Sequence, residues 1–94
     1  MEEPFDAGTA KALILRIISG SGRVTFGSHA EKEMAKDSLC RTDVVNILRC
    51  GAVSVNCHDG THWRYTVETQ RICVVILFRE ETEIRVVTAW RKQP

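Results

Sequence analysis

The longest apolar run of the chain lies near its C-terminal end, and it predicts the strand around which the rest of the fold is arranged. Residues 72–78 are apolar at every position. A strand that is apolar on both sides is covered on both faces, so we expect it in the middle of a sheet. The chain turns at residues 79–82, and residues 83–91 then alternate, which predicts an adjacent strand with one polar face.

This alternation separates two faces of the last strand, because successive side chains of a strand point to opposite sides. The core face is expected to carry Ile84, Val86, Thr88 and Trp90. The other face is expected to carry Glu83, Arg85, Val87, Ala89 and Arg91.

Two more strands are expected before the apolar run. Residues 52–57 alternate, and Asp59-Gly60 is a pair that favours a two-residue hairpin turn. Residues 61–69 also alternate, with Trp63, Tyr65 and Val67 facing the core and with the other face formed by His62, Arg64, Thr66 and Glu68. Tight turns join antiparallel neighbours, so these segments and the two C-terminal strands predict a meander.

The first half of the chain carries mainly helical patterns. Residues 1–6 are expected to form a frayed tail. Thr9 is a candidate N-cap for a helix through Gly20, because apolar residues recur there at helical spacing. Residues 23–27 are short, β-branched and alternating, which predicts a first strand.

Two further helices are expected between this strand and the meander. Ser28 and Glu31 have the spacing of a capping box, which predicts a helix that continues to about Asp37. Thr42 is then a candidate cap for a third helix over residues 43–50.

The expected element order is therefore α-β-α-α-β-β-β-β, in a single domain over residues 1–94 with an ordered core over about residues 8–91. This order predicts an α+β fold in which the N-terminal helices pack on one face of a curved, mainly antiparallel sheet. The opposite face is expected to stay open, and any chemistry is expected there.

Composition narrows the function classes. The chain of 94 residues is 44% apolar and 27% charged, which is ordinary for a soluble globular domain. The net charge of +1 argues against coating of nucleic acid by bulk electrostatics but leaves room for a local basic face. No apolar run approaches the ~20 residues of a membrane span. The acidic N-terminus lacks the basic region of a secretory signal, so we expect a cytoplasmic protein.

The cysteines give no metal signature. Four are present, at positions 40, 50, 57 and 73, and no two have Cys-x-x-Cys spacing. Without a secretion signal we expect free thiols in a reducing compartment. His58 and His62 lie near Cys57, but a zinc site there would need a fourth ligand from a distant part of the chain. We therefore expect no metal and no cofactor.

Two groups of residues resemble a bacterial domain family of unknown function. The first half of the resemblance is Ser28-His29-Ala30, Met34, Asp43-Val44, Leu48 and Gly51. The second half is Trp63-Arg64-Tyr65, Val74-Val75 and Val86-Val87-Thr88-Ala89-Trp90-Arg91. The family is similar to the RelE/ParE-like toxin superfamily, and the resemblance covers about residues 23–91.

The resemblance implies a RelE-like fold, with a helical pair against a curved antiparallel sheet. It also implies a ribonuclease of a toxin–antitoxin pair, with RNA or the ribosome as target and a cognate antitoxin protein as partner. In one respect the chain departs from the family, which usually has Arg three residues after the Met. Asp37 stands there, between Lys36 and Arg41, and a carboxylate would repel a phosphate.

Cleavage of RNA without a metal needs an acid or base for proton transfer and cations for the phosphorane charge. His29 is the best acid or base candidate because its imidazole titrates near neutral pH and it begins a helix. Its structural alternative is simple packing at the strand–helix junction. Arg64 is the second catalytic candidate, since it can hold a phosphate with two donors. Its alternative is a cross-strand pair with Glu68 or Glu83.

Further residues are candidates for RNA binding. His62 and Arg85 share the predicted face of Arg64, whereas Lys36 and Arg41 are helix charges that could contact phosphate or only solvent. Thr88 matches the family pattern, but alternation places it in the core unless a bulge turns it outward.

Two functions remain open from the sequence. One is a toxin-like RNA-binding protein or metal-independent endoribonuclease. The alternative is a non-catalytic protein-interaction module of the same fold, which binds a partner through an edge strand or through the basic face.

Overall fold

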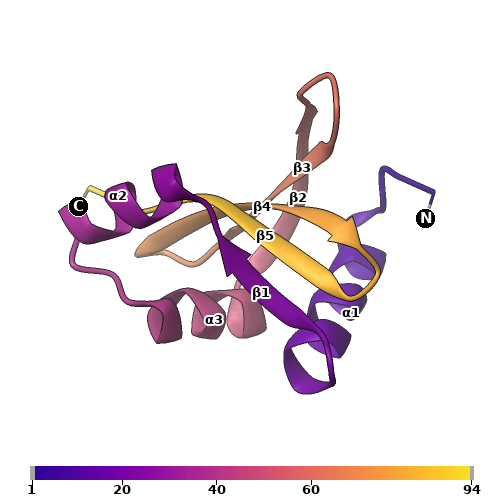
Figure 1. Ribbon diagram of the computed structural model, residues 1–94, viewed down its shortest axis with the longest axis horizontal. Coiled ribbons are helices and arrows are strands. Elements are labelled where there is room, and N and C mark those ends of the chain that lie inside the picture. The colour runs from indigo at the N-terminus through magenta and orange to yellow at the C-terminus, as the bar shows by residue number, and fades with distance from the viewer. Residues whose placement is uncertain (1, 94) are drawn as a thin grey trace.

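Five strands form one mixed sheet in the order β1-β5-β4-β3-β2, which places β4 in the middle (Figure 1). The strands are β1 Arg23–Phe26, β2 Ala52–His58, β3 Trp63–Glu68, β4 Ile72–Glu80 and β5 Glu83–Arg91. This computed structural model describes residues 2–93. The central position of the apolar strand is confirmed. β2 to β5 pair antiparallel in chain order, whereas β1 lies parallel to β5, so the sheet is mixed.

Three helices complete the α+β fold, and the expected element order is confirmed. They are α1 Ala7–Ser19, α2 Ser28–Lys36 and α3 Arg41–Cys50. Their buried side chains share one core with Val67, Val74, Ile76, Ile84 and Val86 of the sheet. α2 continues from the end of β1 and packs beside β5, whereas α1 and α3 pack against each other (Figure 1). No helix within residues 2–93 is long and apolar enough to cross a membrane.

The N-terminal segment is held against the core. The hydroxyl of Tyr65 donates to a carboxylate oxygen of Glu3 at 2.8 Å and accepts from the backbone N–H of Phe5 at 3.0 Å. The Phe5 ring packs edge-on against Phe78, with ring centroids 5.7 Å apart. The prediction of a frayed tail is therefore wrong for residues 3–5, while Met1 lies outside the described residues.

The predicted helix caps are replaced by other residues. Asp6 caps α1, with its Oδ1 accepting from the backbone N–H of Thr9 at 2.7 Å. Gly27 occupies the N-cap of α2, because its N–H still donates to the Val86 carbonyl of β5. Ser28 is then already helical, and the predicted capping box does not form.

The start of α3 also differs from the prediction. Cys40 occupies the N-cap, and the Asp43 carboxylate accepts from its backbone N–H at 2.9 Å. Thr42 therefore lies inside the helix. At the other end, the Lys11 ammonium donates to the carbonyls of Leu48 and Gly51, at 3.0 and 2.8 Å. Burial lowers the pKa of Lys11, and its charge complements the C-terminal end of the helix.

A bulge in β5 changes which residues face the core. Ile76 of β4 pairs with Val86, but Val75 pairs with Thr88, so Val87 is an extra residue. After it the alternation is reversed. Ala89 is fully buried on the core side, whereas Trp90 is 38% exposed on the other face. The prediction that Thr88 and Trp90 face the core is therefore wrong.

The connection between β2 and β3 is longer than predicted, and the hairpin that these strands form extends beyond the rest of the sheet (Figure 1). His58 pairs with Trp63, so the connection is residues 59–62 rather than a two-residue turn. Gly60 has a φ of 97°, a conformation that suits glycine. His62 lies in this connection and not on the strand, contrary to the prediction.

Candidate functional site

The sheet face turned away from the helical core is called here the open face. Residues that pair directly across neighbouring strands share a face, so the register identifies its members. Three sets of cross-strand partners belong to it. They are Thr25 (β1), Arg85 (β5) and Leu77 (β4); Thr88 (β5), Val75 (β4) and Thr66 (β3); and Trp90 (β5), Cys73 (β4) and Glu68 (β3). Arg64 precedes Thr66 by two residues on β3 and therefore has the same orientation.

The floor of the open face is apolar and well covered by its neighbours. Cys73, Val75 and Leu77 of β4 are only 4%, 6% and 8% exposed, although the helices pack on the other face. On the neighbouring strands, Arg64, Glu68 and Arg85 are longer and polar, whereas Thr66 and Thr88 are short and Trp90 is a large aromatic residue. Burial, followed by the nearby Glu68 carboxylate, raises the pKa of the Cys73 thiol to about 11. The middle strand of the open face is thus apolar and buried, and charged side chains lie on the strands beside it.

Arg85 connects the open face to the beginning of α2. A Cβ atom on Gly27 would lie 3.5 Å from Nη2 and 3.6 Å from Nε of Arg85, so the guanidinium lies directly over this glycine. Within residues 2–93, Arg85 forms no ion pair with an acidic side chain. His29 is exposed two residues after Gly27, in the first turn of α2. The first turn of a helix has free N–H groups and attracts anions.

A buried carboxylate lies beside this corner. The Glu83 side chain is 3% exposed; its Oε1 accepts from Arg23, with Nη2 at 2.9 Å, and its Oε2 accepts from the Thr25 hydroxyl at 2.9 Å. Arg79 lies 3.6 Å away. The hydrogen bond from Arg23 is the main reason that the pKa of Glu83 is lowered. The alternation of residues 83–91 places Glu83 on the face of Arg85, but it does not indicate that Glu83 is buried among Arg23, Thr25 and Arg79.

Arg64 is held by the hairpin connection. Its Nε donates to Oδ2 of Asp59 at 3.0 Å, and 36% of the side chain is exposed. The other oxygen of Asp59 accepts from the backbone N–H groups of Thr61 and His62, and these bonds hold the pKa of Asp59 well below its usual range. Arg64 thus pairs with Asp59, not with Glu68 or Glu83. The His62 side chain makes no hydrogen bond within the described part of the chain.

The two helix cations have acidic partners. Lys36 Nζ lies 2.9 Å from a carboxylate oxygen of Glu33 on the same helix. Arg41 pairs with Glu31, and its guanidinium carbon lies 5.0 Å from the ring centre of Phe26, whose partner Val86 belongs to the core face. Arg41 is therefore on the helix side of the sheet. The candidate residues that the fold brings to one face are Arg64, Arg85 and Thr88, whereas His29 belongs to the first turn of α2, two residues after the Gly27 that Arg85 covers.

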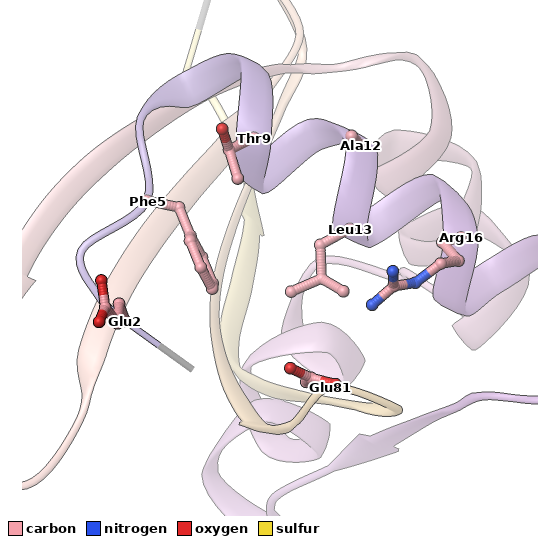
Figure 2. Close-up of a pocket in the computed structure, with 7 residues that line it drawn as sticks. All are labelled: Glu2, Phe5, Thr9, Ala12, Leu13, Arg16 and Glu81. Carbon is pink, nitrogen blue, oxygen red and sulfur yellow. The ribbon is translucent and has the colours of Figure 1, made fainter.

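A separate hollow lies on the other side of the molecule, between the N-terminal segment, α1 and the β4–β5 turn (Figure 2). Its volume is about 390 Å³. Phe5 and Leu13 point into it, and the remaining lining residues are Glu2, Thr9, Ala12, Arg16 and Glu81. None of the candidate residues named from the sequence lines it.

The described residues hold no group of three or more His, Cys, Asp or Glu side chains arranged for a metal ion. Comparisons with protein-family models, with curated proteins and with solved structures each found no match.

Proposed function

We propose that the protein is a small toxin-like RNA-binding protein that cleaves RNA without a metal ion. The observation that carries this proposal is the position of Arg85, which has no acidic partner among residues 2–93 and lies over Gly27 at the beginning of α2. A cation beside the free N–H groups of a helix terminus is a suitable place for a phosphate. The resemblance of residues 23–91 to RelE/ParE-like toxins supports the same assignment.

In this mechanism a phosphodiester lies between Arg85 and the first turn of α2. His29 acts as acid or base: as a base it takes the proton of the ribose 2′-hydroxyl, whose oxygen then attacks the adjacent phosphorus. The bond from phosphorus to the 5′-oxygen breaks, that oxygen takes a proton from water, and the other fragment ends in a 2′,3′-cyclic phosphate. Arg85 and the helix N–H groups stabilise the charge of the phosphorane.

The remainder of the open face would hold the flanking nucleotides. Arg64 lies on β3 at the hairpin end and can contact a second phosphate, although it must share its guanidinium with Asp59. Trp90 is 38% exposed on this face and offers a surface for base stacking. A cognate antitoxin would inhibit the protein by covering the same face.

The alternative is a non-catalytic protein-interaction module of the same fold. It is favoured by the ion pairs of Arg64, Lys36 and Arg41, because a cation with an acidic partner contributes less to binding of RNA. In this case the open face would bind a protein partner, and His29 would have no chemical role.

The test combines growth after induced expression in a bacterium with cleavage of a labelled RNA by the purified protein in EDTA. The variants are His29→Ala, Arg85→Ala and Arg64→Ala, at matched soluble levels. Arg49→Ala serves as a charge-matched control, since Arg49 is exposed on α3 and, among residues 2–93, its side chain bonds only to Asn46.

Each mechanism gives a different result. Ribonuclease action predicts growth arrest and cleavage by the wild type and the control. His29→Ala should lose cleavage, whereas Arg85→Ala should lose RNA binding as well. RNA with a 2′-deoxy substitution at the cut site should bind but stay intact. Binding without cleavage in all variants, or no binding of RNA at all, would favour the interaction module.

A further inference from the structure

β2 is an edge of the sheet that no charged side chain or proline protects ahead of its bulge at Asn56. Six of its seven residues have exposed side chains. An edge strand leaves every second N–H and C=O group without a neighbour, and proteins usually guard such edges with charges or proline. β2 contains no Asp, Glu, Lys, Arg or Pro. It is therefore open to pairing with another strand.

The opposite edge differs. β1 has only four residues and begins with the charged Arg23. After Gly27 the chain turns into α2, which packs beside β5 where β1 has ended. Short length, charge and an adjoining helix protect this edge, so the exposure of β2 is not a general feature of the sheet.

Two exposed apolar side chains lie on the strand and the helix at this edge. Val55 pairs with the core residue Tyr65 and so points to the same side, yet it is 39% exposed. Leu15 is 38% exposed on α1, the helix that packs against β2. Of the three large hydrophobic residues exposed within residues 2–93, two therefore lie on elements at this edge.

We propose that β2 pairs antiparallel with β2 of a second copy of this chain, so that the two sheets become one. The contact would be isologous, with a two-fold axis through the strand pair and with both α1 helices on the same side of the joined sheet. Val55 and Leu15 of each copy would cover those of the other.

Charge supports a second copy as the partner strand. Because β2 contains no Asp, Glu, Lys or Arg, pairing it with itself sets no such like charges opposite each other. The bulge at Asn56 limits regular pairing to Ala52–Val55.

The test is sedimentation equilibrium over a wide range of protein concentration, in reducing buffer so that the exposed thiols cannot link copies. Wild type should form a dimer. Val55→Lys should raise the dimer dissociation constant at least about tenfold, because it sets two ammonium groups close together. Leu15→Lys, on a helix, should act in the same direction. Gln70→Lys adds the same charge in the β3–β4 turn and should change nothing.

The strand contact itself is read from isotope-filtered NOEs between labelled and unlabelled copies, which should connect β2 backbone protons. A monomer at every concentration would overturn the proposal. So would a dimer that Val55→Lys leaves unchanged, one that Gln70→Lys weakens equally, or NOEs between other strands. Circular dichroism of each variant separates loss of pairing from loss of fold. Since the open face is not used, these outcomes are independent of RNA binding.

Discussion

Asp37 holds Arg91 at the end of the sheet. The Asp37 carboxylate accepts from the backbone N–H of Arg91 at 2.7 Å. The backbone carbonyl of Asp37 accepts from Nε of the Arg91 side chain, also at 2.7 Å. The contact joins the C-terminal end of α2 to the last residue of β5. It gives the carboxylate a structural role at the position where the resembling family usually carries Arg.

Asp37→Ala should destabilise the protein by about 1 kcal/mol, since it removes a charge-assisted hydrogen bond to the backbone N–H of Arg91. The loss should appear as a lower urea midpoint without a change in m-value. Glu80→Ala is a suitable control, because that carboxylate is exposed and forms no ion pair within residues 2–93. Equal stability of Asp37→Ala and wild type would show that the contact contributes nothing.

Glu83→Gln should cost about 2 kcal/mol at neutral pH, because the buried side chain keeps its place but loses the charge that pairs with Arg23 and Arg79. The pKa of Glu83 is lowered in the folded protein. Its contribution is therefore complete above the unfolded pKa of about 4.3 and disappears as the pH falls through the lower folded value.

Urea titrations at neutral and acidic pH would measure this effect. The stability difference between wild type and Glu83→Gln should shrink as the pH is lowered below the ordinary glutamate range. A difference that stays constant with pH would mean that the carboxylate acts by shape alone. Glu81→Gln, on the exposed β4–β5 turn, should show no such dependence.

The outline of the fold was predictable because it depends on local patterns. The apolar run at residues 72–78 identified the central strand, and helical spacing identified α1 and α3. The Val87 bulge was not predictable, because Val86-Val87 and Ala89-Trp90 are apolar at both parities and only the register with β4 reveals which residue is extra. That one residue moves Thr88 and Trp90 from the expected core to the open face.

The candidate site was predictable only in part. Alternation correctly placed Arg64 and Arg85 on one face of the sheet. The approach of Arg85 to Gly27 depends on the parallel pairing of β1 with β5, which joins segments far apart in the chain. The pairing of Arg64 with Asp59 depends on the length of the hairpin connection. The Asp59-Gly60 pair predicted a two-residue turn, whereas the connection has four residues, 59–62.

Thiol reactivity should separate the cysteines into two classes. Cys40, Cys50 and Cys57 are exposed, whereas Cys73 is buried and its pKa is raised to about 11. Since the thiolate is the reactive form, DTNB at pH 8 should label three thiols rapidly and the fourth only after denaturation. Replacement of Cys73 by Ser should remove only the slow phase. Rapid labelling of all four thiols in the folded protein would contradict the buried position of Cys73.

The only tyrosine of the chain offers a direct test of how the N-terminal segment docks. Burial raises the pKa of Tyr65 to about 12, and its hydroxyl joins Glu3 and Phe5 to β3. Absorbance of the phenolate at alkaline pH therefore reports one residue, and its midpoint should lie near 12 in the folded protein. In denaturant the midpoint should return to about 10.

The sign of the effect on stability follows from these two values. A phenol whose folded pKa is raised contributes stability that is complete below the unfolded pKa and is lost as the pH rises through the folded one. Wild type should therefore lose stability above pH ~10 relative to Tyr65→Phe, which cannot ionise. Tyr65→Phe should also speed hydrogen exchange of the Phe5 amide, while exchange of the Ala10 amide, bonded to Asp6 inside α1, stays unchanged. A phenolate midpoint near 10 in the folded protein would mean that the hydroxyl is solvated and that residues 3–5 are not docked.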